Sequence, residues 1–312
     1  MFTAQKALFL YAVSPVHMGA GTALGLIDNP IQRERHTDYP VIAGSGLKGA
    51  VRHRFWQQAP GQREKLDRYF GRDTNNLNDK ASDYAGAVSF SDAQLIAFPV
   101  RCGRAGFVYA TSPLALARGK RLLAAAGVSG VESWSVSTPA PGRCGLINED
   151  LLCNGKLQVD SYELEPEIDT NLKSIAEWIA ANAFPNELKV DFFKEKFQSD
   201  LVLMSDDDFG YFVKNATLVE PHVRIDNDTG VAEGGGLFYT ENLPPESLLL
   251  SVVMATDERS SYSKKAEAAS ILNDVVEANG GFGGLDAQLL QVGGDAITGR
   301  GQIIVSAVEC LR

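Results

Sequence analysis

Short apolar runs suited to β-strands lie at both ends of the chain, and helical segments separate them without a regular alternation. The clearest runs are residues 6–13, 248–255 and 302–308. A strict alternation of strands and helices would predict a parallel, doubly wound sheet. Because strands and helices mix irregularly here, the sequence predicts an α+β fold.

Hydrophobic spacing places the other elements. We expect helices at residues 45–58, 63–70, 114–126, 175–183, 188–197 and 263–279, and strands at 87–96, 106–110, 157–164 and 285–292. Residues 217–225 and 236–240 flank an Asp-Asn-Asp-Thr-Gly turn and predict a β-hairpin. The acidic triplet 206–208 is interpreted as a helix start rather than a metal site, because consecutive helical residues point in different directions.

Positive charge is concentrated near the amino terminus of an acidic protein. The 312 residues carry a net charge of −10, yet residues 1–72 hold ten Lys or Arg against five Asp or Glu. The remaining 240 residues hold nineteen against thirty-four. Screening limits each field to about 10 Å, so local potential decides whether a polyanion binds. We therefore expect phosphate contacts in the amino-terminal block, where residues 23–40 form a long loop of the kind that is often functional.

Composition excludes several classes of protein. No apolar run approaches the roughly 18 residues of a membrane span. Residues 1–13 make a poor signal peptide and a good first strand. Cys102, Cys144, Cys153 and Cys310 form no close pair, so we expect reduced thiols in a cytoplasmic protein rather than a zinc site or disulfides.

Two glycine-rich segments resemble nucleotide-binding loops in pattern but not in context. Residues 44–49 match G-x-G-x-x-G. A dinucleotide-binding fold would need a hydrophobic strand directly before this loop and an acidic residue near the end of the next strand, about 20 residues later. Here a basic helix follows, and then a second charged helix. Residues 294–301 resemble a Walker loop with Arg300 in place of the lysine and a strand in place of the helix. Both segments nevertheless offer backbone N–H groups and a cation to the phosphates of a polymer.

Motifs spread along the whole chain carry a family resemblance. They occupy residues 14–21, 27–34, 40–52, 235–246 and 291–301. In combination they resemble the RAMP superfamily of CRISPR proteins. The Asp-x-Pro-Ile-Gln-Arg-Glu stretch that begins at Asp28 resembles, more narrowly, the multi-copy backbone subunit of the type III-B (Cmr) effector complex. The glycine loop departs slightly from the family pattern, since it has Gly-Ser-Gly where a second serine is common.

The resemblance implies a ferredoxin-like, RRM-related palm with helical elaborations and an inserted β-hairpin thumb that intercalates the guide–target duplex. It implies one elaborated domain over residues 1–312, with the palm at 1–130 and 245–312 and the insertions at about 131–244. It also implies copies stacked as a filament on a CRISPR guide RNA, together with other effector subunits. Each copy would cut target RNA at regular intervals with a divalent metal ion, Mg²⁺ or Mn²⁺.

The resemblance also assigns roles to individual residues. The family's catalytic aspartate falls on Asp28, which is also the expected metal ligand. The superfamily's amino-terminal histidine falls on His17, and its Lys-Gly helix start falls on Lys48. We treat His17, Glu233 and Glu241 as possible auxiliary groups, with surface carboxylates as the alternative interpretation of the two glutamates.

The residues themselves fit this chemistry. Attack by a 2′-hydroxyl requires that oxygen to lose its proton, and the charge that develops on the phosphorus must be stabilised. A carboxylate such as Asp28 can serve as the base or bind a metal ion, and the sequence leaves both roles open. Arg33 and Arg35 can hold the scissile phosphate. For His17 we prefer a positioning role over a catalytic one.

Affinity for the guide is expected to come from other cations. Lys48, Arg52 and Arg54 lie on a helix that follows a glycine loop, and together with Arg300 they can contact guide phosphates. Base pairing between guide and target would read the sequence. Phe238 and Tyr239 are available as apolar wedges on the thumb.

Two alternatives remain open from the sequence. In the first, the chain is a non-catalytic backbone subunit in which Asp28 braces its loop through Arg33 or Arg35. In the second, it is a repeat-RNA processing endoribonuclease of the same superfamily, with His17 as the base.

Overall fold

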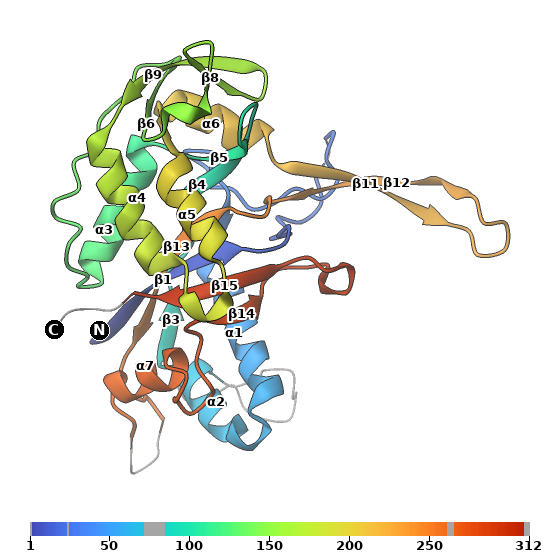
Figure 1. Cartoon of the computed structure of the whole chain (residues 1–312). Coiled ribbons are helices and arrows are strands. Elements are labelled where there is room, and N and C mark those ends of the chain that lie inside the picture. The colour runs from blue at the N-terminus through green and yellow to red at the C-terminus, as the bar shows by residue number, and fades with distance from the viewer. Residues whose placement is uncertain (1, 24, 72–84, 261–264, 309–312) are drawn as a thin grey trace.

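The computed structural model of the chain describes residues 2–23, 25–71, 85–260 and 265–308, apart from the side chain of Glu233 (Figure 1). Strand β1 (Ala4–Ala12) lies between β13 (Leu248–Ala255) and β15 (Gln302–Ala307) and is antiparallel to both. Beyond β13 comes β4 (Ala93–Cys102), and β14 (Gln288–Gln291) pairs with β15 at the other edge. The short strands β2 (Val41–Ile42) and β3 (Val88–Phe90) pair with β4 and β13.

The same sheet continues past β4 into the middle of the chain. Its further strands, in spatial order, are β5 (Gly106–Thr111), β10 (Leu201–Met204), β6 (Arg143–Leu146), β9 (Tyr162–Ile168), β8 (Lys156–Val159) and β7 (Leu152–Cys153). Parallel and antiparallel pairs both occur, because β10 runs parallel to β5 and antiparallel to β6. The fold is therefore of the mixed α+β class.

Helices cover both faces of the central strands. The first hydrophobic core receives α1 (Gly44–Gln58), α2 (Arg63–Phe70) and α7 (Ala268–Val276), and the second receives α3 (Pro113–Ala125), α4 (Thr170–Ala183) and α5 (Asp191–Asp200). Along β1, Leu8 and Leu10 point into the first core, while Phe9 and Tyr11 point into the second. Burial on both faces explains why this strand has an unbroken apolar sequence.

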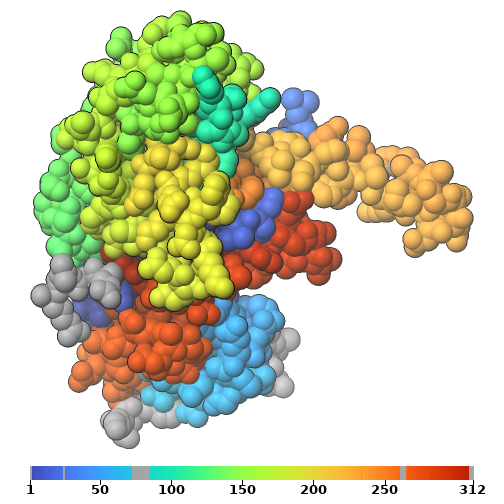
Figure 2. Space-filling model, in the orientation of Figure 1, coloured from blue at the N-terminus to red at the C-terminus, as the bar shows by residue number. Residues whose placement is uncertain are grey.

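A hairpin projects from the body of the molecule (Figures 1 and 2). Helix α6 (Asp206–Asn215) leads into β11 (Leu218–Ile225), which pairs with β12 (Ala232–Asn242). At the tip, the Asp226 carboxylate accepts hydrogen bonds from the backbone of Asp228 and Thr229. The hairpin and its turn confirm the prediction, although β12 begins earlier than expected. We call this segment, residues 218–242, the thumb.

Most of the predicted elements are present, but three differ in extent. Residues 87–96 and 157–164 were each expected to be one strand, and each is divided between two, β3 with β4 and β8 with β9. Residues 263–279 were expected to be one helix, but residues 261–264 lie outside the described part and α7 spans only Ala268–Val276. The backbone is extended at Glu267 and Glu277, and Gly280 packs against the backbone of Asn273, so the chain leaves the helix before the glycines. Strands β6, β7 and β10 were not predicted. The remaining short helical turns are η1 (Pro60–Gln62), η2 (Glu149–Leu151), η3 (Asn186–Leu188) and η4 (Ala296–Thr298).

Several exclusions can be checked in the described residues. Ser205 caps α6 by accepting from the Asp208 N–H, so the acidic triplet is a helix start, as predicted. Within the described ranges, Cys102, Cys144 and Cys153 are free thiols, and Cys310 lies outside them. None of the described helices has the length and apolar character that crossing a membrane requires.

Candidate functional site

The base of the thumb is joined to the amino-terminal loop through one edge of β12. Pairing with β11 leaves the backbone groups of Tyr239, Glu241 and Leu243 pointing the other way. Asn29 donates to the Tyr239 carbonyl and accepts from the Glu241 N–H, both at 3.0 Å. Val16 and Leu243 exchange two hydrogen bonds of 2.9 Å. Two separate segments of the amino-terminal region therefore extend the thumb's own ladder.

Two candidate residues complete this edge with their side chains. The Asp28 Oδ2 accepts from the Tyr239 N–H at 2.7 Å. The His17 Nδ1 lies 2.7 Å from the Glu241 carbonyl oxygen. A carbonyl only accepts, so Nδ1 carries the proton and Nε2 is the free end of the ring. The anchoring positions are two residues apart on one strand, which corresponds to about 7 Å.

The loop that carries Asp28 is held to the body by ion pairs. The Arg33 guanidinium contacts Glu241 at 2.6 Å and also donates to the carbonyls of Asp38 and Val213. Glu34 forms a bidentate pair with Arg118. Burial alone would raise the pKa of Glu34, but hydrogen bonds from Arg118 and Thr37 lower it. The long loop is therefore ordered by its own charges, and Arg33 braces it through Glu241 rather than through Asp28.

Glu241 is a buried carboxylate, so its interpretation as a surface group is wrong. Its side chain is only 4% exposed. One oxygen accepts from Arg33 and from the Thr217 hydroxyl, and the other accepts from the Ile31 N–H at 3.0 Å. These bonds hold the loop to the thumb. Glu233 lies on β12, and its side chain is outside the described part of the structure.

The three cations of α1 do not share a face. Arg52 pairs with Asp67 at 2.7 Å and lies over the Trp56 ring. Arg54 donates to the Leu289 carbonyl and to Gln288 Oε1 on β14. Lys48 is half-buried, and burial together with the charges of Arg259 and Arg52 lowers its pKa. Lys48 and Arg52 are one helical turn apart and lie on the same side of α1, whereas Arg54 is turned away from Arg52 by about 200°.

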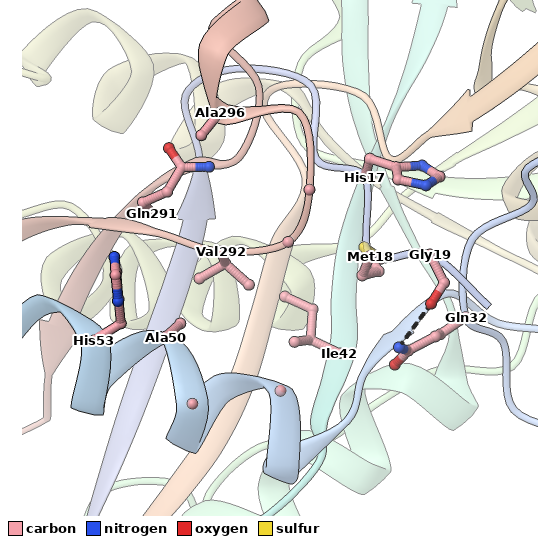
Figure 3. A pocket seen from close by; sticks show the side chains of 14 residues that line it. His17, Met18, Gly19, Gln32, Ile42, Ala50, His53, Gln291, Val292 and Ala296 are labelled. Atoms are coloured by element: carbon pink, nitrogen blue, oxygen red, sulfur yellow. Dashed lines mark hydrogen bonds between the residues drawn. The ribbon is translucent and has the colours of Figure 1, made fainter. Parts of the chain in front are cut away.

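A cavity of about 540 Å³ lies on another face of α1 (Figure 3). Its walls come from four separate segments, namely residues 17–19, Gln32, residues 42–53 with Gly46, Gly49 and His53 on α1, and residues 291–296. Each segment carries a motif that is visible in the sequence, but their convergence is not. His53 lines this cavity although it was not predicted as a site residue.

Glycine at position 293 permits the close approach that forms this cavity. Gly293 has φ +82°, and a Cβ there would lie 2.3 Å from the His17 carbonyl oxygen. The next residue, Gly294, donates to that oxygen at 2.9 Å. At the end of the same loop, Arg300 pairs with Glu220 on β11. The loop thus links the His17 segment to the thumb.

Aromatic rings lie on the thumb beyond Asp28. Phe238 and Tyr239 are partly exposed. The His222 ring stacks on Phe238 with centroids 5.1 Å apart and planes at 16°. Sequence reasoning missed His222, whose role depends on the register that places it opposite Phe238. Arg35 is exposed on the loop that precedes Tyr39.

Comparison with known proteins identifies the family. A model of the RAMP superfamily matches residues 9–304. The chain belongs to the RAMP superfamily. Over 302 residues it is 32% identical to the CRISPR system Cmr endoribonuclease Cmr4 of Pyrococcus furiosus, an alignment covering 96% of this chain and 94% of that protein.

Solved structures agree with this assignment to the RAMP superfamily. A crystal structure of oligomeric Cmr4 from Pyrococcus furiosus matches with a TM-score of 0.71 at 26% identity, over 99% of each chain. A chain in the cryo-EM structure of the type III-B Cmr-beta complex bound to cognate target RNA matches with a TM-score of 0.70. At 21% identity over 98% of each chain, that second match shows a shared fold.

Proposed function

We propose that this chain is the guide-RNA-binding backbone subunit of a type III-B CRISPR effector complex and an endoribonuclease that cuts target RNA. One observation carries the proposal. Asp28, the residue that matches the family's catalytic position, is held half-exposed at the root of a projecting thumb by the Tyr239 N–H. The chain is 32% identical, almost from end to end, to a protein named as a Cmr endoribonuclease. Its free thiols suit a cytoplasmic location.

The palm of this subunit is proposed to be ferredoxin-like. In support, the strand order β15-β1-β13-β4 is antiparallel throughout, α1 lies between β1 and β4 in the chain, and α7 lies between β13 and β15. We propose that residues 1–130 and 245–312 form the palm of a single elaborated domain. The helical segments and the thumb at about 131–244 are then insertions.

Asp28 has one carboxylate oxygen free for chemistry, because Oδ2 is occupied by the Tyr239 N–H. In the proposed reaction the 2′-oxygen of the target loses its proton and attacks the adjacent phosphorus, and the 5′-oxygen leaves with a proton. The free oxygen of Asp28 can accept the first of these protons. His17 bonds to the same strand edge through Nδ1, and its Nε2 is proposed to orient the phosphate.

A divalent metal ion fits this site only if RNA supplies most of its ligands. The described residues contain no group of three or more His, Cys, Asp or Glu side chains placed to hold a metal. Mg²⁺ is often bound by one carboxylate, phosphate oxygens and water, and Asp28 can provide that carboxylate. When bound, such an ion would stabilise negative charge on the phosphate.

Guide RNA is proposed to follow the cavity between α1 and residues 291–296, with Lys48 of α1 adding positive charge. Arg33, Arg52, Arg54 and Arg300 have protein partners, so any contact that they make with RNA must compete with those partners. Copies stacked along one guide, with other effector subunits, would place successive thumbs at regular intervals. The exposed rings of Phe238 and Tyr239 can then stack on splayed bases.

The decisive experiment assembles the complex with Asp28→Ala and adds labelled target RNA. We expect target binding to persist and the periodic cuts to disappear. Asp228→Ala, which removes an exposed carboxylate at the thumb tip, is the control and should cut normally. Normal cutting by Asp28→Ala would contradict the assignment. Weakened assembly would favour a structural role for Asp28, and cleavage of repeat RNA by the isolated chain would favour the processing enzyme.

A further inference from the structure

Glu246 is a carboxylate in apolar surroundings, in the turn that follows the thumb. It lies against a pocket of about 290 Å³ lined by residues of β1, the start of α5, β14 and β15. Tyr11, Phe193 and Ile304 contribute to the walls. The Glu246 Oε2 atom is buried and has no hydrogen-bond partner in the described structure. Burial raises the pKa of this carboxyl to about 7. A buried polar atom without a partner is rare in native proteins and requires an explanation.

The backbone holds this side chain in place at the expense of strain. Glu246 has φ +70°, a conformation that residues with a Cβ rarely adopt. Its N–H donates to the Ala12 carbonyl at 2.8 Å, and the Ala12 N–H donates to the Ser247 carbonyl at 3.0 Å. These bonds tie the turn to the end of β1. Strained residues that the surrounding structure fixes in this way are concentrated at functional sites.

The pocket opens on an apolar part of the surface. Val13 and Leu289 line it and are 41% and 47% exposed. Phe192, which packs against Phe193, is 69% exposed. Single exposed apolar residues are ordinary, but three around one pocket form a patch of the kind found where proteins associate. We call this pocket and its rim the Glu246 pocket.

The chemistry of the Glu246 pocket selects its occupant. A lysine or arginine side chain has an apolar stem that can lie along Val13, Leu289 and Ile304. Its cationic end can pair with the unpartnered carboxylate. An apolar side chain would leave Oε2 unpaired, and an anion would be repelled. The fitting group is therefore a basic side chain on a protein surface.

We propose that the Glu246 pocket receives a lysine or arginine side chain from a second copy of this chain. The inference rests on the proposed function, in which copies stack along RNA. Charge complementarity supports a second copy, because residues 1–72 hold ten basic against five acidic residues. Arg35 and Arg63 in that block are exposed and belong to segments that do not line the pocket. A contact between two different surfaces of one molecule repeats in one direction and builds an open filament.

This contact would release a proton. The pairing requires a charged carboxylate, whereas the free copy holds a proton on Glu246 up to a pKa of about 7. Among the residues that line the pocket, the one other titratable group is the Tyr11 hydroxyl, which bonds to the Tyr109 hydroxyl. Association should therefore strengthen between pH 6 and pH 8, by up to about tenfold per pH unit below the pKa.

Sedimentation velocity on the full chain, with and without a single-stranded RNA of guide length, tests the proposal. We expect Glu246→Gln and Leu289→Arg to weaken self-association at least tenfold at pH 8, and Glu246→Gln to remove the pH dependence. Ile168→Arg is the matched control, because Ile168 is also on a strand and is 49% exposed. Unchanged association in both pocket variants, or a wild-type chain that stays monomeric with RNA, would overturn the proposal.

Two further readouts separate this role from others. Glu246→Gln should leave the thermal unfolding temperature unchanged or raised, since it removes a charge without a partner; a clear fall would indicate a structural role and contradict the proposal. If Glu246→Gln still self-associates but no longer binds a different effector subunit, the occupant of the pocket is that subunit and not a second copy. Cutting by the assembled complex is measured separately with Asp28→Ala, so failure of the pocket and failure of the proposed endoribonuclease are distinguishable.

Discussion

The carboxylate of Asp28 accepts a hydrogen bond of 2.7 Å from the backbone N–H of Tyr239, which belongs to a strand 211 residues later in the chain. The bond ties a loop near the amino terminus to the root of the thumb. A displacement of the thumb root would either move the carboxylate with it or break this bond. The geometry couples the element proposed to splay the duplex to the group proposed to cut it.

This bond gives Asp28→Asn and Asp28→Ala different expected effects. The amide oxygen of asparagine can still accept from Tyr239, so Asp28→Asn should keep the loop in place while removing the base or metal ligand. We expect cutting of target RNA to fall by about 10²–10⁴-fold in both variants. Asp28→Ala should in addition lose about 1 kcal/mol of stability. Single-turnover cleavage and urea unfolding measure the two effects, and substantial cutting by Asp28→Asn would contradict the assigned role.

Removal of the Glu241 side chain should destabilise the site, although this buried side chain makes no contact with RNA. Its partner Arg33 is 16% exposed, so Glu241→Ala leaves a largely buried cation unpaired. We expect a loss of about 3–5 kcal/mol in the free energy of unfolding, together with reduced cutting. Glu163→Ala, which removes an exposed partner of Lys156, should cost less than about 0.5 kcal/mol. Similar values for the two variants would show that Glu241 does not hold the loop.

Glycines 293 and 299 form a matched pair for testing the cavity near His17. Both have φ +82° and lie in the same loop, but a Cβ on Gly299 would meet nothing within 4 Å. Gly299→Ala should cost only the left-handed strain, about 1–2 kcal/mol. Gly293→Ala also clashes with the His17 carbonyl, which adds about 1–3 kcal/mol. Guide-RNA binding should weaken in Gly293→Ala alone, and equal weakening in both variants would argue against the cavity as the binding groove.

The sequence predicted elements whose signals are local. The strand 248–255 was predicted with the observed bounds, because a strand buried on both faces reads as an unbroken apolar run. The thumb was predicted because its turn residues are distinctive. The side-chain partners were not predictable, since Arg54 meets Gln288 and Arg33 meets Glu241 only after distant segments pack together. A cation that is identified from a motif can therefore be paired with another protein group in the fold, and it is then not available to RNA.

Glu258 should make stability depend on pH in the acidic range. The Arg68 guanidinium, which donates to Glu258 Oε1 at 2.6 Å, holds the pKa of this buried carboxyl at about 2, against 4.5 ordinarily. Because the folded-state pKa is the lower one, the stabilisation is complete above about pH 4.5 and is lost as pH falls towards 2. Urea unfolding of the wild type and Glu258→Gln should show a gap that narrows from pH 7 to pH 3. A gap independent of pH would contradict this assignment.

The two nitrogens of His17 can be tested separately. In His17→Asn the amide nitrogen takes the place of Nδ1, so the bond to the Glu241 carbonyl can persist while the outward nitrogen is lost. In His17→Gln the amide nitrogen takes the place of Nε2, and the bond to Glu241 is lost. If Nε2 acts on RNA, His17→Gln should retain more cutting than His17→Asn. If His17 instead acts through the thumb edge, the order should reverse.

We expect His17→Gln to retain more cutting than His17→Asn, because Nδ1 is bonded to the Glu241 carbonyl and Nε2 is the ring nitrogen left for RNA. Loss of a group that positions the phosphate should raise the target concentration at which cutting is half-maximal. The maximal rate should change by less than about tenfold in either variant, since proton transfer by a general base contributes 10²-fold or more. Steady-state cleavage by complexes assembled with each variant measures both quantities. A loss of maximal rate above about 10²-fold in His17→Asn, with binding unchanged, would make His17 the proton acceptor and leave Asp28 as the metal ligand.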